Sequence, residues 1–259
     1  MTKRKQVYWL SDAEWSAIEP HLPKGRSGAR RVDDRRVISG IVHMLRSGAR
    51  WRDCPSEYGP YTTIYNRFNR WSRQGVWSGI FYALTGKSDV VTGAIDATYV
   101  KAHRSAAGAK GGPSNNAIGA SRGGRTTKIH ALTDDLGRPR ALVLTAGNTH
   151  DLVGAGAVLK LVPTPRKLLA DRAYDARKLR DWLVERGCEP VIPPNPTRKH
   201  PHTYDPVAYR SRNAIERMFC RLKDFRRIAT RYDKRADNFL SAVLLAAAVT
   251  WWTPIESRA

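Results

Sequence analysis

The sequence predicts a mixed α and β protein, with a helical domain over residues 1–88 and a mixed five-stranded sheet flanked by helices over residues 89–259. Three observations predict this fold class. Apolar residues recur at helical spacing through the first third of the chain. From Val90 onward the chain changes to short runs of strand-forming residues. Helical segments separate the later strands, which is typical of parallel strands joined by crossovers.

The first third contains three predicted helices. Ser11 followed by Glu14 is a capping box, so a helix begins there. A second helix is expected over 37–45 and a third over about 61–71. On the third helix the residues expected to point outward are Thr62, Asn66, Arg67, Asn69 and Arg70.

Two short helices, a turn and a further helix rich in Arg and Asn are the pattern of a helix-turn-helix DNA reader. Arg and Asn side chains read the edges of guanine and adenine in the major groove. We therefore predict DNA contacts by Arg67 and Arg70. The alternative is a small helical bundle with an ordinary polar face.

The remaining chain alternates strands and helices. The expected strands cover 90–102, 128–135, 138–148, 166–170 and 189–192, and the expected helices cover 150–161, 176–186, 207–223 and 236–252. The last of these helices is expected to dock on the sheet. A Gly-rich segment over 104–127 cannot bury much apolar surface, so it is predicted to be a mobile loop that orders on DNA.

The charge balance predicts a polyanionic partner. The chain has 45 Lys and Arg against 23 Asp and Glu, a net charge of +22, and a sequence pI near 10.5. Nucleic acid is the first candidate partner and a membrane surface is the weaker one. The start of the chain does not resemble a signal peptide, and the longest apolar run is too short to span a bilayer. Three widely separated cysteines indicate neither a zinc site nor a disulfide framework, which fits a reducing cytosol.

Three acids stand in positions that suggest chemistry. Asp96 lies inside an apolar strand, Asp171 follows the strand ending LLA, and Glu216 is on the late helix. A buried Asp is costly unless it is paired or bound to a metal ion. Oxygen-only ligands favour Mg²⁺ or Mn²⁺. The alternatives are an Asp96 bonded to backbone and an Asp171 that only caps a turn; Asp151 and Asp175 are rival acids, interpreted as caps.

The late helix carries a polar stripe. At about 100° per residue, Tyr209, Arg212, Glu216 and Lys223 fall within a stripe roughly 60° wide. A carboxylate among cations suits a site for a metal ion and a phosphate. The simpler alternative is a solvated face with an ordinary i,i+4 ion pair between Arg212 and Glu216.

These acids and the spacing Tyr-x2-Arg-x3-Glu-x6-Lys resemble the DDE transposases of bacterial insertion sequences, most closely the insertion sequence five family. The segments WRDCPSEYGPYTTIYNRFNRW and AGAKGGPSNNAIGASRGGRTTKIHA are also similar to that family, so the resemblance covers nearly the whole chain. It implies an RNase H-like catalytic domain after a helical DNA-binding domain. It implies metal binding by Asp96, Asp171 and Glu216, and contacts to DNA-end phosphates by Tyr209, Arg212 and Lys223.

The resemblance further implies Mg²⁺-dependent cleavage at terminal inverted repeats and transfer of the 3′ hydroxyl into target DNA, with Mn²⁺ as a substitute. It also implies a homodimer or larger assembly on double-stranded DNA, in the bacterial cytoplasm with the nucleoid. About 44 residues lie between Asp171 and Glu216, fewer than in relatives with a β insertion, so cleavage through a DNA hairpin stays open. The alternative functions are a non-catalytic DNA-binding regulator derived from a transposase, and a cellular nuclease that hydrolyses without joining.

Overall fold

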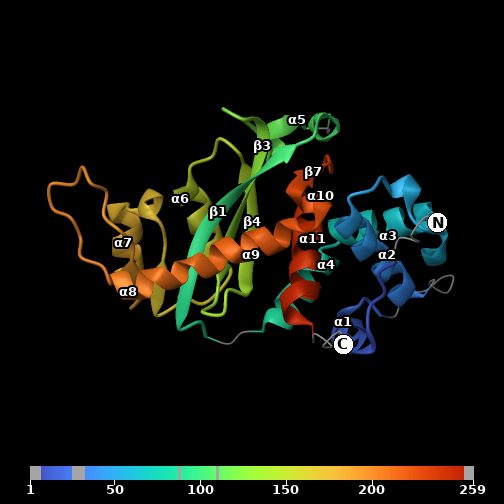
Figure 1. The fold of residues 1–259 in the computed structure, drawn as a ribbon, viewed down its shortest axis with the longest axis horizontal. Helices are drawn as coiled ribbons and strands as arrows, with labels where there is room; N and C mark the ends of the chain where they lie inside the picture. The colour runs from blue at the N-terminus through green and yellow to red at the C-terminus, as the bar shows by residue number, and fades with distance from the viewer. Residues whose placement is uncertain (1–6, 25–32, 87–88, 109–110, 254–259) are drawn as a thin grey trace, which may run out of the picture. The chain divides into compact units, whose positions relative to one another are not determined.

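The computed structural model describes residues 7–24, 33–86, 89–108 and 111–253 (Figure 1). The chain forms two compact units: Met1–Gly86 together with Leu222–Ala259, and Lys87–Arg221. The first is called the helical unit below and the second the sheet unit. The sequence placed residues 222–259 with the sheet, whereas the structure groups them with the first helices.

The helices of the first third follow the prediction closely. The capping box is present, with Glu14 N–H donating to Ser11 Oγ at 3.1 Å and Ser11 N–H donating to the Glu14 carboxylate at 2.8 Å. Gly48, with φ of 69°, ends the second helix in the left-handed conformation that glycine adopts freely. The elements are α1 (Asp12–Ile18), η1 (Glu19–His21), α2 (Asp34–Ser47), η2 (Trp51–Asp53), η3 (Ser56–Tyr58), α3 (Tyr61–Arg73) and α4 (Val76–Thr85).

The C-terminal segment completes the core of the helical unit. It contains α10 (Arg226–Ala229), the short β7 (Thr230–Arg231) and α11 (Ala236–Ala247), which continues as the π-helical turn η7 (Ala248–Trp252). Helix α11 was predicted as a helix, but it packs on α4, α3 and α2 rather than on the sheet. Its almost continuous burial, from Phe239 to Ala248, requires apolar partners on several sides, and three helices provide them.

Arg67 corrects the predicted outer face of α3. Its side chain is only 5% exposed, it pairs with Asp34, and its guanidinium carbon lies 4.9 Å from the centre of the Trp71 ring. Position 67 lies one turn from Ile64 and Trp71, on the buried side of the helix. Arg67 is therefore a buried ion-pair residue and not part of the exposed face on which it was predicted, whereas Arg70 is exposed as predicted.

The sheet unit contains the predicted mixed sheet. Strand β1 (Thr92–Ala102) pairs antiparallel with β3 (Gly124–Thr133), which pairs antiparallel with β4 (Pro139–Ala146). On its other side β1 pairs parallel with β5 (Lys167–Leu169), which pairs parallel with β6 (Glu189–Val191). The five predicted strands thus run in the order β4-β3-β1-β5-β6.

The Gly-rich segment is more structured than predicted. It contains η4 (Arg104–Ala107), α5 (Gly112–Asn115) and an additional strand, β2 (Gly119–Ser121), which pairs with the start of β3. Thr127 Oγ1 donates to the Ala117 carbonyl at 2.6 Å, so the segment is tied to β3 by a side chain as well as by strand pairing. Residues 109–110 lie outside the described residues.

Helices lie on both faces of the sheet. Ile95 points into an apolar core with residues of α6 (Asp151–Leu159), and the next residue of β1, Asp96, points to the other face, where it meets Arg212 just before α9 (Asn213–Lys223). The other elements of this part of the chain are η5 (Arg172–Tyr174), α7 (Arg177–Val184), α8 (Pro206–Tyr209) and η6 (Arg210–Arg212).

Helix α6 begins with a different cap from the one predicted. His150 is the N-cap and accepts a hydrogen bond from Leu152 N–H at 3.3 Å, whereas Asp151 binds Lys128 at 2.8 Å. Among the described residues, no helix is both long enough and apolar enough to cross a membrane.

Candidate active site

Strand register brings the two predicted aspartates together. Ala94 of β1 pairs with Leu169 of the parallel strand β5. Asp96 and Asp171 each lie two residues beyond that pair, so their carboxylates lie at the same level of adjacent chains. The two carboxylates are close enough to repel each other, because the negative charge of Asp171 contributes to raising the pKa of Asp96.

Asp96 is held tightly for a surface-facing acid. Its Oδ1 accepts a hydrogen bond from Ala97 N–H at 2.7 Å, its Oδ2 accepts one from Arg212 at 3.0 Å, and its side chain is 20% exposed. Burial is the main reason that the pKa of Asp96 is raised, with Asp171 adding to the rise, while the Ala97 N–H and Arg212 oppose it. Because burial disfavours the ionised form of Asp96, a further positive charge nearby would stabilise its carboxylate.

Arg212 bridges the strand and the helix. One guanidinium nitrogen donates to Asp96 and the other to Glu216, four residues further along. Arg212 is 16% exposed, and Glu216 is 55% exposed. The i,i+4 pair expected from the simpler interpretation is therefore present, and the same arginine also reaches the half-buried Asp96 on β1. This second contact distinguishes the arrangement from a solvated helix face.

Asp171 has a local role as well as its place beside Asp96. Its Oδ1 accepts from Ala173 N–H at 2.9 Å and so caps η5, as the alternative interpretation expected. In the same turn the Tyr174 hydroxyl is buried and has no hydrogen-bond partner among the residues that the structure describes. Burial and the charges of Asp96, Asp151 and Asp171 raise the pKa of Tyr174, so its hydroxyl stays protonated. Sequence reasoning missed Tyr174, although it stands in the same DRAYD segment as Asp171.

Asp175 is the C-cap residue of η5, but its side chain does not cap α7. Its side chain is fully buried, and it accepts hydrogen bonds of 2.7 Å from Arg180, Arg198 and the backbone N–H of Asn195. Burial opposes ionisation, but these donors outweigh it and lower the pKa of Asp175 to about 2. Asp175 is therefore the centre of an ion-pair network that fixes the loop after β6, and it is separate from the acids that Arg212 bridges.

The other residues of the predicted stripe lie along the late helix. Tyr209 ends α8, its ring centre is 5.7 Å from that of Tyr204, and the Arg212 guanidinium carbon is 5.7 Å from its ring centre. Lys223 is the last residue of α9. The turn η6 interrupts the regular helix between Tyr209 and Asn213, so the stripe is not the single continuous α-helical face that the sequence predicted.

The donor set suits a divalent metal ion that prefers oxygen ligands. Three carboxylates from a strand, a strand end and a helix supply oxygen atoms only, and mutual repulsion between Asp96 and Asp171 favours a cation beside them. Within the described part of the chain, no three His, Cys, Asp or Glu side chains are already arranged around one metal position. The Arg212 guanidinium instead lies between two of these acids and contacts both Asp96 and Glu216. A metal ion bound by both would require Arg212 to move aside.

Two families match the sequence. Residues 10–81 match the family described as "Putative transposase of IS4/5 family (DUF4096)", and residues 88–251 match the family described as "Transposase DDE domain".

Individual relatives carry the same description. A "Putative transposase for insertion sequence element IS6501" from Brucella ovis is 37% identical over 127 residues, which are 49% of this chain and 98% of that protein. A "Putative transposase for insertion sequence element IS402" from Burkholderia cepacia is 30% identical over 141 residues, which are 50% of this chain and 64% of that protein. Among solved structures, a piggyBac transposase in a synaptic complex with hairpin DNA aligns with 94% of this chain and 72% of its own, at 9% identity and a TM-score of 0.49.

Proposed function

The chain belongs to the family of DDE transposases, and we propose that it cuts double-stranded DNA at the terminal inverted repeats of an insertion sequence and joins the freed 3′ hydroxyl to target DNA. The observation that best supports this reaction is that Asp96 and Asp171 lie at the same level on neighbouring parallel segments. Arg212 contacts both Asp96 and Glu216 and so links β1 to the late helix.

The family implies dependence on a divalent metal ion. We assign the ion as Mg²⁺, replaceable by Mn²⁺, and its ligands as Asp96, Asp171 and Glu216. Such an ion supplies Lewis-acid stabilisation of the scissile phosphate and lowers the pKa of an attacking water. The order β4-β3-β1-β5-β6, antiparallel on one side of β1 and parallel on the other, supports an RNase H-like fold for the sheet unit.

The chain's own residues contribute positioning and charge. Each carboxylate oxygen of Asp96 already accepts a hydrogen bond before substrate binds, so the side chain loses little conformational freedom during the reaction. Arg212 carries a planar fork of donors that matches phosphate as well as carboxylate. When a phosphate enters, Arg212 exchanges its carboxylate contacts for phosphate contacts and offsets the developing negative charge. Tyr209 at the end of α8 and Lys223 at the end of α9 contact DNA-end phosphates.

The helical unit supplies DNA binding. Arg70 is exposed on α3, so we retain the proposal that it contacts DNA. A helix-turn-helix mode stays a proposal, because α2 and α3 are joined by a segment that holds two short 3₁₀ helices rather than by a short turn. Two DNA ends have to be held together, which supports action as a homodimer or larger assembly.

The test uses purified protein, the DNA ends of its own element and Mg²⁺, with Asp96→Asn and Glu216→Gln as variants. Wild type is expected to create new 3′ ends at the repeat boundary and to form strand-transfer products. Both variants are expected to lose cleavage by a factor of about a thousand or more while retaining end binding, because the proposed metal ligands are lost and the DNA contacts remain.

Other outcomes have defined meanings. Binding without cutting by wild type, in Mg²⁺ or Mn²⁺, would favour the regulator function. Cutting without joined products would favour a nuclease. A Glu216→Gln variant that still cuts at full rate would remove Glu216 from the site.

A further inference from the structure

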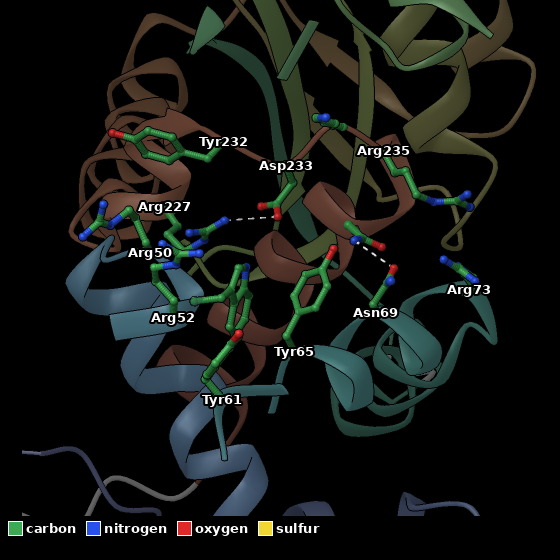
Figure 2. Close-up of a pocket in the computed structure, with 13 residues that line it drawn as sticks. Arg50, Arg52, Tyr61, Tyr65, Asn69, Arg73, Arg227, Tyr232, Asp233 and Arg235 are labelled. Atoms are coloured by element: carbon green, nitrogen blue, oxygen red, sulfur yellow. Dashed lines mark hydrogen bonds and ion pairs between the residues drawn. The ribbon is translucent and has the colours of Figure 1, made fainter. Parts of the chain in front are cut away.

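The helical unit contains a pocket of about 570 Å³ (Figure 2). One side of α3 forms a wall of it, because Tyr61, Tyr65, Asn69 and Arg73 follow one another at four-residue spacing and so share one helix face. The remaining walls come from residues 50–52 and from residues 227–238 of the C-terminal segment. A cavity of this size is in the range that accepts a small organic ligand, about 300–1,000 Å³.

Aromatic rings form a fixed surface in this pocket. The ring centre of Trp51 is 5.6 Å from that of Tyr65 and 5.3 Å from that of Phe68, which is fully buried and anchors the group. Tyr61 and Tyr65 are nevertheless 44% and 37% exposed. Large rings held rigidly yet open to solvent lose little entropy when a flat ligand stacks on them.

The pocket is strongly positive. Its lining contains six cationic side chains and, among the described residues, one carboxylate: Arg50, Arg52, Arg73, Arg227, Lys234 and Arg235 against Asp233. Asp233 is already paired with Arg227 at 3.2 Å. Within the described part of the chain, Arg52, Arg73 and Lys234 have no ion-pair partner. Three cations are thus available to an incoming anion.

Four buried polar atoms belong to residues that line the pocket. Among the described residues, Trp51 Nε1 and Arg227 Nε are donors without a partner, and Asp233 Oδ2 and Asn238 Oδ1 are acceptors without one. Asn238 and Asp233 are only 5% and 7% exposed, so solvent water has little access to hydrogen-bond with them. Exposed rings of Tyr61 and Tyr65 beside cations that are unpaired in the described part of the chain suit a ligand that joins a flat ring to an anionic group, as a nucleotide does.

We propose that this pocket binds one unstacked nucleotide of a DNA strand. The base stacks on the exposed ring of Tyr65, and its phosphate contacts Arg52, Arg73 or Lys234, which have no ion-pair partner among the described residues. The inference rests on DNA being the substrate of the proposed function, and adds that the helical unit recognises an unpaired nucleotide and not only a duplex groove. Arg67 and Arg70, predicted from the sequence as DNA readers, are not part of this pocket.

The test compares three DNA probes by fluorescence anisotropy without divalent metal, so that no cleavage occurs. They are a blunt duplex, the same duplex with a four-nucleotide single-stranded overhang, and that duplex with an overhang of four abasic sites. Wild type is expected to prefer the base-containing overhang over the other two. Tyr65→Ala should weaken binding to that probe by about five- to a hundredfold, the usual range for loss of one stacked base, and Tyr65→Phe should retain it.

Controls separate this site from general effects. Trp9→Ala removes an equally exposed ring of the same unit that does not line the pocket, and should leave all three affinities unchanged. Tyr65→Ala should leave binding to the blunt duplex and the melting temperature unchanged. A 2-aminopurine in the overhang should lose fluorescence on binding to wild type and Tyr65→Phe, but not to Tyr65→Ala.

Equal binding of the abasic and base-containing overhangs by wild type would overturn the proposal, as would an unchanged affinity of Tyr65→Ala. In either case duplex binding by wild type would leave the proposed function standing. Failure of wild type to bind any of the probes would instead count against DNA as the substrate.

Discussion

At the scale of single residues, Arg212 is the most informative side chain of the site. It donates to Asp96 and to Glu216 at once, so it supplies positive charge where the proposed reaction needs a metal ion. Mutual repulsion of acids usually disfavours a compact arrangement unless cations intervene. Under the proposed function, this guanidinium would hold Asp96 and Glu216 in place before metal and DNA arrive, and it would compete with the metal ion for the same oxygens.

Arg212→Gln is expected to increase the affinity for Mn²⁺ in the absence of DNA and to lower cleavage in its presence. Release of two ion-pair contacts, at about 1 kcal/mol in total, corresponds to roughly fivefold tighter binding. Titration calorimetry measures the metal affinity directly. Arg217→Gln is the matched control, because Arg217 lies on the same helix and contacts Asn213 instead of the acids. Weaker Mn²⁺ binding by Arg212→Gln would contradict the competition.

Asp175 gives the sheet unit a specific sensitivity to acid. The pKa of Asp175 is about 2 in the folded state, below the ordinary value near 3.9, so the unfolded chain takes up its proton first. Its contribution of about 2 kcal/mol is present above pH 4 and is lost as the pH falls towards 2. Urea unfolding of wild type and Asp175→Asn should show a stability difference that narrows over this range. A difference that stays constant with pH would exclude this role.

At the scale of elements, the turn between β3 and β4 sets the position of α9. Gly137 has a φ of 74°, and a Cβ atom there would lie 3.1 Å from the carbonyl oxygen and 3.2 Å from the Cβ of Ala214. Ala214 is on the first turn of α9, next to the residues that meet Asp96. The absence of a side chain at Gly137 therefore allows the helix to approach the turn.

Gly137→Ala is expected to lower the free energy of unfolding by about 2–3 kcal/mol and to reduce cleavage, since the left-handed backbone costs about 1–2 kcal/mol and the crowded helix must shift. Gly187→Ala is the matched control. Gly187 has a φ of 69° but no neighbour within 4 Å of the added atom, so it should show the backbone cost alone. Equal loss of stability and unchanged cleavage in both variants would show that the contact with Ala214 does not position α9.

Patterns local in sequence predicted most of the elements. The Ser11–Glu14 capping box and the change to strand-forming residues at Val90 depend on neighbouring residues only, and both are confirmed. The exposure of Arg67 and the packing of α11 were predicted wrongly, because burial depends on which distant segment supplies a partner. Asp34 is the partner of Arg67, and α2, α3 and α4 are the partners of α11. Such contacts between distant segments cannot be predicted from the spacing of residues along the sequence.

The candidate site shows the same limit. Asp96 and Asp171 were found because an acid in an apolar strand is costly and therefore conspicuous. The pairing of Asp96 with Asp171 depends on the register of β1 with β5, and the bridge made by Arg212 depends on the approach of the late helix to β1. Spacing along one helix encodes neither. Tyr65 and Arg227 line one pocket although 161 positions separate them, so the sequence offered no signal for that pocket.

At the scale of the whole molecule, the helical unit is built from two distant parts of the chain. Residues 1–86 supply α1 to α4, and residues 222–259 supply α10 and α11, with the sheet unit between them in sequence. The faces of α2, α3 and α4 that α11 covers are apolar, and Ile38, Ile41 and Phe81 are fully buried. The N-terminal helices therefore do not have a complete core of their own.

A chain ended after residue 221 is expected to lose the fold of the helical unit and to keep that of the sheet unit. Loss of α11 exposes apolar surface on three helices at once, and each buried Leu or Ile side chain is worth about 1.5–3 kcal/mol. Amide hydrogen exchange resolved by segment would report rapid exchange in α2 and α3 and protection in β1 and β3. Protection of α2 at the full-length level would show that residues 1–86 fold without the C-terminal segment.

The divided origin of the helical unit also imposes a delay during synthesis. The ribosome adds about 135 residues between the end of one part and the start of the other. At ~5–20 residues per second this takes roughly 7 to 27 seconds, which is long compared with the microseconds in which helices form. During that interval the nascent helices present their unfinished apolar faces to the cell, so the yield of active protein depends on chaperones and on the speed of translation as well as on the stability of the finished fold.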